Sequence, residues 1–469
     1  MTTCSSVRSL LLIAAAAFTG ASGCQTYHAE VKTMAGAWSG NQLEIAAKQF
    51  GERADKESQT KDGVLWHLEA GAAHRAIGAY PESNRHLETA AAQVDDHEQQ
   101  ARVRVGQETM AVMSNQQNLP YVGRSYDKIM LHTYKALNHL ALGEVEKARP
   151  EIIRAYQRQQ DAVEENNQRI EKAREEERQA ENRAEVEKAR ADRKFSQALD
   201  GVTSELEGFK FYADYVNPFT VYLDALYFMY AGADASDLER ARKSLKRIQE
   251  IAGDNKFIQA DLDSIETASN VSSQQPVTYV LFETGQAPQR EQIRIDIPII
   301  VTSVSYVGAA FPKLVFPKDY APELTVTAGD VQAKTATLAS LDAIVALDFK
   351  NEWPVILTKT IVSTVAKGVA AYAINEAASR QSSLFGLVTK IGTAVAQAAV
   401  NIADTRTWTT LPKEFQIARV PTPPDRKIIL EKPGAAPVEV MLEEGVVNVV
   451  CAKSITTSDR LLVSQFKLK

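Results

Sequence analysis

The chain has 469 residues, of which 45% are hydrophobic and 24% are charged, and its formal net charge is −6. This composition is typical of a folded, soluble protein. The slight acidity excludes a global basic field that would attract nucleic acid, so no nucleic-acid partner is expected. A chain of this length is expected to form about two to four domains.

The first residues resemble a lipoprotein export signal. Arg8 is followed by the apolar run 10–18 and then by small residues that end at Cys24. The apolar run is too short to cross a bilayer, which needs roughly 20 residues. Residues 1–23 are therefore expected to be a cleaved signal peptide. The small residues before Cys24 resemble a lipobox, in which a diacylglycerol is attached to the cysteine thiol.

Two neighbouring residues bear on the anchor. Ala21 stands where a lipobox usually has Leu, and Ala-Ser-Gly also suits an ordinary signal peptidase, which would release an unanchored periplasmic protein. Gln25 follows the cysteine, and by resemblance to Gram-negative sorting rules this favours the outer membrane, facing the periplasm. We expect a lipid on Cys24 and a tether over residues 24–40.

From residue 41 to residue 270 the pattern is almost entirely helical. Small residues occur where two antiparallel helices must approach closely, and this spacing resembles a tetratricopeptide repeat of about 34 residues. Weaker copies surround Gly143 and Gly232. Three copies predict a short stacked solenoid, and a generic helical bundle is the alternative. The residues expected to pack the repeats are Trp66, Gly71, Gly78, Tyr80, Ala90, Gly143 and Ala148.

Within this region, residues 161–194 are charged throughout. They contain no Pro or Gly, and opposite charges recur three and four residues apart, which favours a helix. The accompanying apolar stripe is too thin for a coiled coil. We predict a long solvated helix that extends from the solenoid, either as a connector or as an arm that reaches a partner.

From residue 276 to residue 469 the periodicity changes to two, as in Ile293-Arg294-Ile295-Asp296-Ile297. This alternation predicts a β domain, either a sandwich or a partly open barrel, and the fold class is therefore multidomain α+β. Strands are expected at 278–282, 292–297, 303–308, 323–327, 342–349, 416–420, 427–430, 438–442, 446–452 and 461–467.

Residues 353–404 interrupt the predicted β domain. They are rich in Ala, Val and Gly, with a break near Ser382 and charges at Lys367 and Lys390. They predict a helical hairpin of small residues. It is either buried against the sheet or able to enter a membrane or pore assembly, because small residues permit close helix contact in both settings.

Several local sequences together resemble a family of uncharacterised bacterial outer-membrane lipoproteins with tetratricopeptide-like repeats and a C-terminal β domain. They are Asn217-Pro218-Phe219, the segments 279–288 and 293–298, the small-residue hairpin, and the segment 403–408. The resemblance covers most of the mature chain and implies the domain order and the surface location. It supplies no known reaction, so no catalytic residue is carried over.

The sequence offers no motif for catalysis, for a cofactor or for a metal site. His67 and His74 lie two helical turns apart, about 10 Å by helical rise, which is too far to hold one ion without a third element. The histidines are therefore interpreted as structural. Cys451 is expected to be a small buried hydrophobic residue, with no disulfide partner.

The polar cluster that most suggests a specific role consists of Asp404, Arg406 and Trp408. It is interpreted as structural, with Arg406 paired to Asp404 and Trp408 packed at a corner, or alternatively as a ligand contact. The leading hypothesis for function is a non-enzymatic envelope scaffold that binds a protein partner through the repeat groove and the β domain. The alternative is a subunit of an oligomeric secretion or pore assembly that uses the hairpin.

Overall fold

The computed structural model describes residues 27–103, 116–180, 183–212, 215–267, 275–301, 304–381 and 402–469. The predicted signal peptide and Cys24 lie outside these residues.

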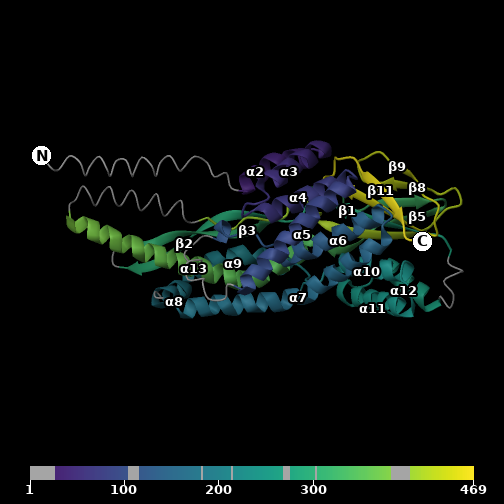
Figure 1. Cartoon of the computed structure of the whole chain (residues 1–469). Coiled ribbons are helices and arrows are strands. Elements are labelled where there is room, and N and C mark those ends of the chain that lie inside the picture. Colours follow the sequence, from purple (N-terminus) through teal and green to yellow (C-terminus); the bar gives the residue numbers. More distant parts are fainter. Residues whose placement is uncertain are drawn as a thin grey trace.

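The described fold is α+β, with a helical region followed by strands and a long helix (Figure 1). The helices are α2 (Tyr27–Ser39), α3 (Leu43–Glu57), α4 (Gly63–Ala76), α5 (Tyr80–Val103), α6 (Ser125–Ala141), α7 (Val145–Arg178), α8 (Arg183–Ala191), α9 (Arg193–Thr203), α10 (Pro218–Tyr230), α11 (Ala235–Ala252), α12 (Lys256–Thr267) and α13 (Leu341–Gln381). The strands are β1 (Val277–Thr284), β2 (Gln289–Val301), β3 (Val304–Val315), β4 (Thr325–Ala328), β5 (Val331–Lys334), β6 (Ala336–Ser340), β7 (Glu414–Pro421), β8 (Lys427–Glu431), β9 (Val438–Met441), β10 (Val447–Ser454) and β11 (Leu462–Lys467).

The prediction of a tether over residues 24–40 is wrong for residues 27–39, which form α2. Tyr27, Val31 and Trp38 are buried, and α2 packs against α3. These large apolar residues recur at helical spacing, a pattern that places them on one face of a helix. The folded body therefore begins within a few residues of Cys24.

Three antiparallel helix pairs, α4–α5, α6–α7 and α10–α11, build most of the helical region. Gly78 and Gly143 follow the first helices of two pairs with φ of +76° and +72°, a conformation that glycine adopts without steric cost. In the third turn, a Cβ on Gly232 would lie 2.3 Å from the carbonyl oxygen of Phe228. All three turns therefore depend on glycine.

The helices of the first pair cross closely at Gly71. A Cβ on Gly71 would lie 2.5 Å from Cδ2 of Leu87, and the Ser83 hydroxyl donates a hydrogen bond of 2.6 Å to the Gly71 carbonyl oxygen. Gly71 thus lies at a close helix crossing, as its spacing predicts. Of the other residues expected to pack the repeats, Tyr80 is half-buried, and the buried ones are Trp66, Ala90 and Ala148. The prediction is wrong for Gly78 and Gly143, which are exposed turn residues with nothing within 4 Å of an added Cβ.

The prediction of one long solvated helix over residues 161–194 is wrong in two respects. The helix α7 starts earlier, as the second helix of its pair, and ends at Arg178, after which α8 and α9 follow. Ala162 and Ala173 are buried, and α13 packs against α7 and α8. Arg190 of α8 donates a hydrogen bond of 2.7 Å to Thr358 of α13. Part of this segment, including Ala162 and Ala173, is therefore a packing face, whereas Val163 stays exposed.

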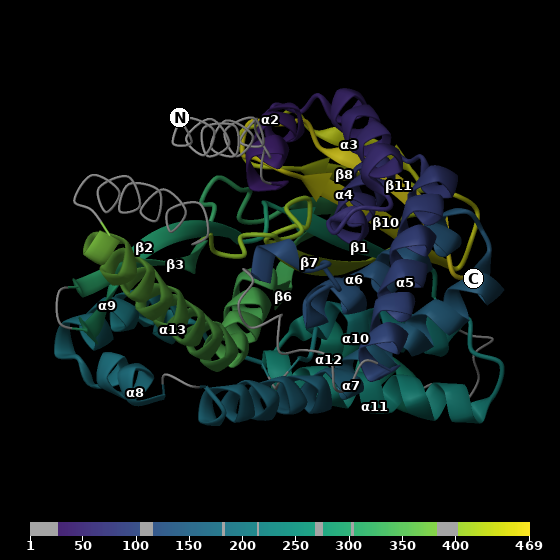
Figure 2. The same cartoon turned by 60° about the vertical axis from the view of Figure 1, so that its left-hand side comes forward.

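The described strands form three sheets, none of which closes into a barrel. The largest has the order β11-β10-β1-β7-β6, with β1 parallel to β10 and antiparallel to β7. The second has the order β5-β4-β8-β9, and β4 and β5 contact β7. The third is the long two-stranded ribbon of β2 and β3. In Figure 2 this ribbon lies on the same side of the molecule as α8, α9 and α13.

The central strand β1 is buried along its whole length, because both faces of the sheet are covered. Tyr279 donates a hydrogen bond of 2.6 Å to Asp261 of α12, so the odd-numbered side chains point to the helices. Thr284, on the opposite face, donates to the carbonyl oxygen of Ala321 at 2.8 Å. Burial on both faces explains why β1 reads as a nearly continuous apolar run instead of an alternating one.

The predicted strand over residues 342–349 is wrong, because these residues form the start of α13. Leu341, Val345 and Phe349 are buried and recur one helical turn apart, while the Ala343 amide donates to the Ser340 hydroxyl, a helix N-cap contact, at 3.3 Å. The predicted hairpin is thus described only as α13, which begins at Leu341, since residues 382–401 lie outside the described part. None of the described helices combines the length and the apolarity that a membrane span needs.

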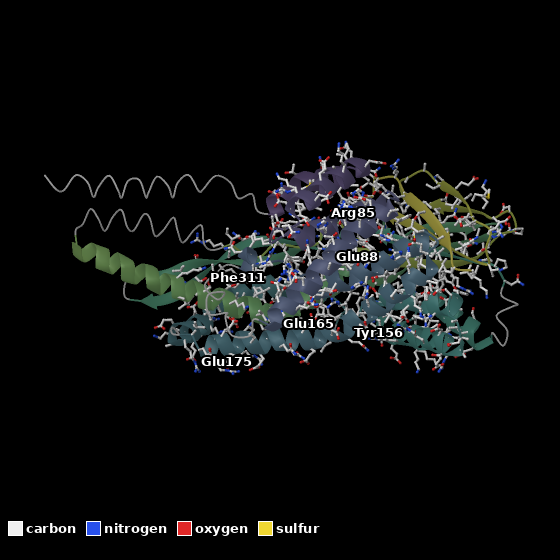
Figure 3. The ribbon with its side chains drawn as sticks, viewed as in Figure 1. Arg85, Glu88, Tyr156, Glu165, Glu175 and Phe311 are labelled. Atoms are coloured by element: carbon white, nitrogen blue, oxygen red, sulfur yellow. The ribbon has the colours of Figure 1, made fainter. Side chains whose placement is uncertain are left out.

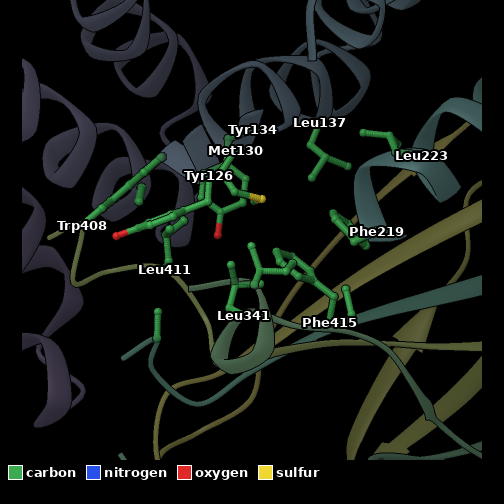
Figure 4. Packing of buried hydrophobic residues seen from close by; sticks show 14 of the residues in the cluster. Tyr126, Met130, Tyr134, Leu137, Phe219, Leu223, Leu341, Trp408, Leu411 and Phe415 are labelled. Atoms are coloured by element: carbon green, nitrogen blue, oxygen red, sulfur yellow. The ribbon is translucent and has the colours of Figure 1, made fainter. Parts of the chain in front are cut away.

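The buried hydrophobic residues of the helices and the strands form one connected cluster. Figure 4 shows its centre, where α6 and α10 meet the loop before β7. The rings of Phe219 and Phe415 are stacked, with centroids 3.9 Å apart, and Trp408 meets Tyr134 edge-on with centroids 5.8 Å apart. The inner helices and the sheet therefore share a core.

We expect Gly71→Leu to destabilise the protein by about 1–3 kcal/mol, because the new side chain would overpack the α4–α5 crossing. Urea unfolding followed by circular dichroism measures the change. Gly201→Ala is the matched control, since a Cβ at Gly201 of α9 meets nothing within 4 Å and alanine favours a helix interior. Equal unfolding midpoints for Gly71→Leu and the wild type would contradict the close crossing.

Candidate functional site

Asp404, Arg406 and Trp408 lie in the loop that leads into β7 and point into the seam between α4, α6 and the sheet. Arg406 donates through Nε and Nη2 to the two carboxylate oxygens of Asp404, both at 2.8 Å, and through Nη1 to Asp62 at 3.0 Å. Burial would raise the pKa of Asp404, but Arg406 lowers it below its usual value. The loop is therefore fixed to the start of α4.

Glu69 of α4 holds the next part of this loop. It is fully buried, and its Oε1 accepts hydrogen bonds from the Tyr27 hydroxyl at 2.7 Å and from the Thr409 amide at 2.6 Å. Its Oε2 accepts from the Thr410 amide at 3.0 Å. Burial raises the pKa of Glu69, whereas these donors oppose the rise. One carboxylate thus joins α2, α4 and the loop.

A second buried carboxylate fixes α13. Glu352 of α13 pairs with Arg124 at the start of α6, with Arg290 of β2 at 2.8 Å and with Arg169 of α7 at 3.2 Å. Burial would raise the pKa of Glu352, but Arg124 and Arg290 together hold it well below its usual range. The first half of α13 is therefore bound to the body by charge as well as by packing.

A cavity of about 210 Å³ lies where the turn between α4 and α5 meets the edge of the sheet at β10 and β11. In its wall, Glu283 of β1 accepts hydrogen bonds of 2.8 Å from both Arg75 and Lys453. Burial would raise the pKa of Glu283, but Lys453 and Arg75 lower it below its usual value. Among the described residues, the buried Nε of Arg75 has no hydrogen-bond acceptor. Two cations of this wall are therefore paired with the Glu283 carboxylate.

Cys451 also lines this cavity. It is partly buried and packs against the hydrophobic core, so its prediction as a small buried hydrophobic residue is confirmed in part. On β10 it lies between Leu281 of β1 and Ser464 of the edge strand β11. Burial raises the pKa of the Cys451 thiol to about 11. A thiol with such a pKa is a poor nucleophile at neutral pH, because the thiolate is the reactive form.

The structure brings His67 and His74 of α4 together with a third histidine, His86 of α5. Nδ1 of His67 and Nδ1 of His86 are 3.0 Å apart, and the rings of His74 and His86 are stacked with centroids 5.4 Å apart. Burial lowers the pKa of His67 and of His86 to about 4. His74, Glu82 and His86 are the residues of the described chain that could hold a metal ion.

Sequence reasoning does not identify Glu69, Glu283, Glu352 or His86. The three carboxylates depend on partners far away in the chain, and His86 meets His67 only because the turn at Gly78 folds α5 back on α4. Two of them do carry a signal. Glu69 interrupts the apolar run of α4, and Glu283 lies near the end of the buried strand β1. A charge on a face that must be buried requires a partner, although the pattern does not name that partner.

Comparison with protein-family models, with curated proteins and with solved structures gives no match for this chain. The interpretation of the site therefore depends on its own geometry.

We expect Glu69→Gln to destabilise the protein by about 1–3 kcal/mol, because the new amide group would face the buried donors of Thr409 or Thr410. Glu187→Gln is the control: the pair of Glu187 with Arg183 is exposed, and exposed pairs contribute less than about 1 kcal/mol. Urea unfolding at neutral pH measures both variants. A Glu69→Gln protein as stable as Glu187→Gln would show that this carboxylate does not hold the seam.

Proposed function

We propose that this protein is a non-enzymatic, lipid-anchored scaffold of the cell envelope that binds a segment of a protein partner. The glycine turns and the close crossing at Gly71 support a tetratricopeptide-like origin of the three helix pairs. Such pairs commonly present their first helices to a peptide. The proposal includes attachment to the outer membrane through Cys24, facing the periplasm.

The repeat groove itself is not open in this fold. Every residue of α10 is buried, and the first helices α4, α6 and α10 meet the sheet and the loop before β7. The protein's own β region therefore occupies the face that a free repeat domain would offer to a ligand. This narrows the binding surface to the cavity, where the first helix pair and the sheet edge still leave space.

The single observation that carries the proposal is the charged lining of that cavity. The charged residues that line the cavity are Glu44, Arg75, Glu283, Lys453 and Arg460, which leaves an excess of positive charge. We therefore propose that the partner contributes an acidic side chain or a chain-terminal carboxylate.

One observation favours the alternative, an assembly subunit. The ribbon of β2 and β3 and the helix α13 lie together on one side of the molecule (Figures 1 and 2). Glu352 and the buried residues Ile361 and Val365 hold the first half of α13 in the body. An assembly contact would therefore use the second half of α13 instead of the first.

The anchor would hold the body close to the bilayer. Tyr27 is buried and bonded to Glu69, and the few residues between it and Cys24 span at most about 10 Å. A freely swinging body is therefore not expected from a lipid on Cys24.

We expect Cys24→Ser to move the protein from the membrane fraction to the soluble periplasm, or to leave it unprocessed. A lipoprotein carries two or more acyl chains, and two membrane signals give stable attachment where one gives only marginal attachment. Cell fractionation with a salt wash measures the shift, and Cys451→Ser is the control that should stay with the membrane. Unchanged, salt-resistant attachment of Cys24→Ser would refute the anchor.

We expect a photo-crosslinking residue at Ile77, in the cavity wall, to trap a partner in intact cells. Ala76→Trp should reduce this crosslink by about tenfold or more, because it fills the cavity and a loss of 1.4 kcal/mol in binding is tenfold in affinity. A crosslinker at Lys48, an exposed residue of α3, is the control. A crosslink that forms at Ile77 and persists in the Ala76→Trp protein would place the partner elsewhere.

A further inference from the structure

We propose that His74, Glu82 and His86 form a binding site for a divalent transition-metal ion of the zinc class. One ring nitrogen of each histidine and one carboxylate oxygen of Glu82 all lie within 4.8 Å of one another. His74 is in the last turn of α4, whereas Glu82 and His86 lie one helical turn apart at the start of α5. The glycine turn at Gly78 folds α5 back and brings the three ligands together.

A glycine on a third helix lets the rings of His74 and His86 approach its backbone closely. A Cβ on Gly51 of α3 would lie 2.9 Å from Nε2 of His74 and 3.6 Å from Nε2 of His86. Both Nε2 atoms therefore face the α-carbon of Gly51. Glycine is unfavourable in a helix interior, and the room that it leaves in front of two imidazole nitrogens gives a reason for its presence.

The hydrogen bonds of His86 fix which of its ring nitrogens carries the proton and which one accepts. Arg85 is only a donor, and its Nη2 lies 2.9 Å from Nε2 of His86, so Nε2 accepts and Nδ1 carries the proton. Nδ1–H then donates to Nδ1 of His67 at 3.0 Å, and Nε2–H of His67 donates to the Ser58 hydroxyl at 3.0 Å. This is the outer hydrogen-bonded shell that orients a metal-binding imidazole.

The acceptors of this site already hold a cation, the guanidinium of Arg85. It contacts His86 and Glu82 and pairs with Asp55, with distances of 3.0 and 3.3 Å to the two oxygens of Asp55. The Arg85 side chain is 44% exposed, and Figure 3 labels its position on α5. It can therefore turn away and keep its pair with Asp55 while an ion takes its place. Arg85 is thus a competitor of the ion.

The ligand types and distances favour zinc over magnesium or calcium. Imidazole nitrogen suits zinc, copper and nickel, whereas magnesium and calcium prefer oxygen ligands. Zinc–nitrogen bonds of about 2.0–2.1 Å in a tetrahedral site require ligand atoms roughly 3.4 Å apart. Nε2 of His86 is already 3.7 Å from Oε1 of Glu82, whose side chain is 43% exposed and is held by Arg85. A water molecule would take the fourth position.

Zinc titration of the purified full-length protein in detergent, in competition with a chromophoric chelator, tests the proposal. We expect one zinc ion per chain, and a Kd weakened by roughly 100-fold in His74→Gln and in His86→Gln, since the loss of an outer-shell partner alone costs roughly 10–100-fold. His97→Gln on the same helix α5 is the control and should bind as the wild type does. Wild-type binding no tighter than that of His86→Gln would overturn the proposal.

Two further variants separate an ion site from a merely structural histidine cluster. Arg85→Ala removes the competing cation and should tighten zinc binding by about tenfold, which corresponds to 1.4 kcal/mol. Gly51→Ala keeps every ligand residue but places a Cβ 2.9 Å from Nε2 of His74, so zinc binding should be lost while the circular dichroism spectrum without metal is unchanged. A Gly51→Ala protein that binds zinc as tightly as the wild type, or an Arg85→Ala protein that binds it no more tightly, would show that the ion does not occupy this position.

Discussion

The carboxylate of Glu283 constrains most of this structure, because it lies in the central strand of the main sheet and is enclosed by helices. Arg75 of α4, Tyr134 of α6 and Lys453 of β10 all donate to it. Removing an ion from water costs several kcal/mol, which only well-placed partners can offset. The positions of α4, α6 and the sheet are therefore interdependent, and a shift of any one of them would leave a buried charge without its partner.

The same constraint explains why the helical and β regions do not act as separate modules. Glu69 and Arg406 fix the loop before β7 to α4, and Glu352 fixes α13 to β2 and α7. Between these charges, Phe219 and Phe415 stack in the shared hydrophobic core. Separation of the regions would expose this apolar surface and break the buried ion pairs, so we expect cooperative unfolding of the two regions.

Elements with a clear local pattern could be predicted from the sequence. The alternation of Ile293, Ile295 and Ile297 predicts β2 correctly, and the small residues of the first pair predict the close crossing at Gly71. The prediction for the segment 342–349 fails because its apolar residues fit the period of a strand as well as that of a helix. The N-cap contact of Ser340 favours the helix. Residues 27–39 mislead because α2 is short and is stabilised by burial against α3 rather than by helix propensity.

The candidate sites could be predicted only in part, because their residues lie on α4 and on other elements that only the fold brings next to α4. The spacing of His67 and His74 places both on one helix face, but the third histidine, on α5, follows from the turn at Gly78. On the remaining circumference of α4, Glu69 and Arg75 contact the loop and β1. One helix therefore carries the proposed ion site on one face and the cavity wall on another. A rigid helix transmits a change on either face to the other, so an ion that fixed α4 against α5 would also fix Arg75 in the cavity.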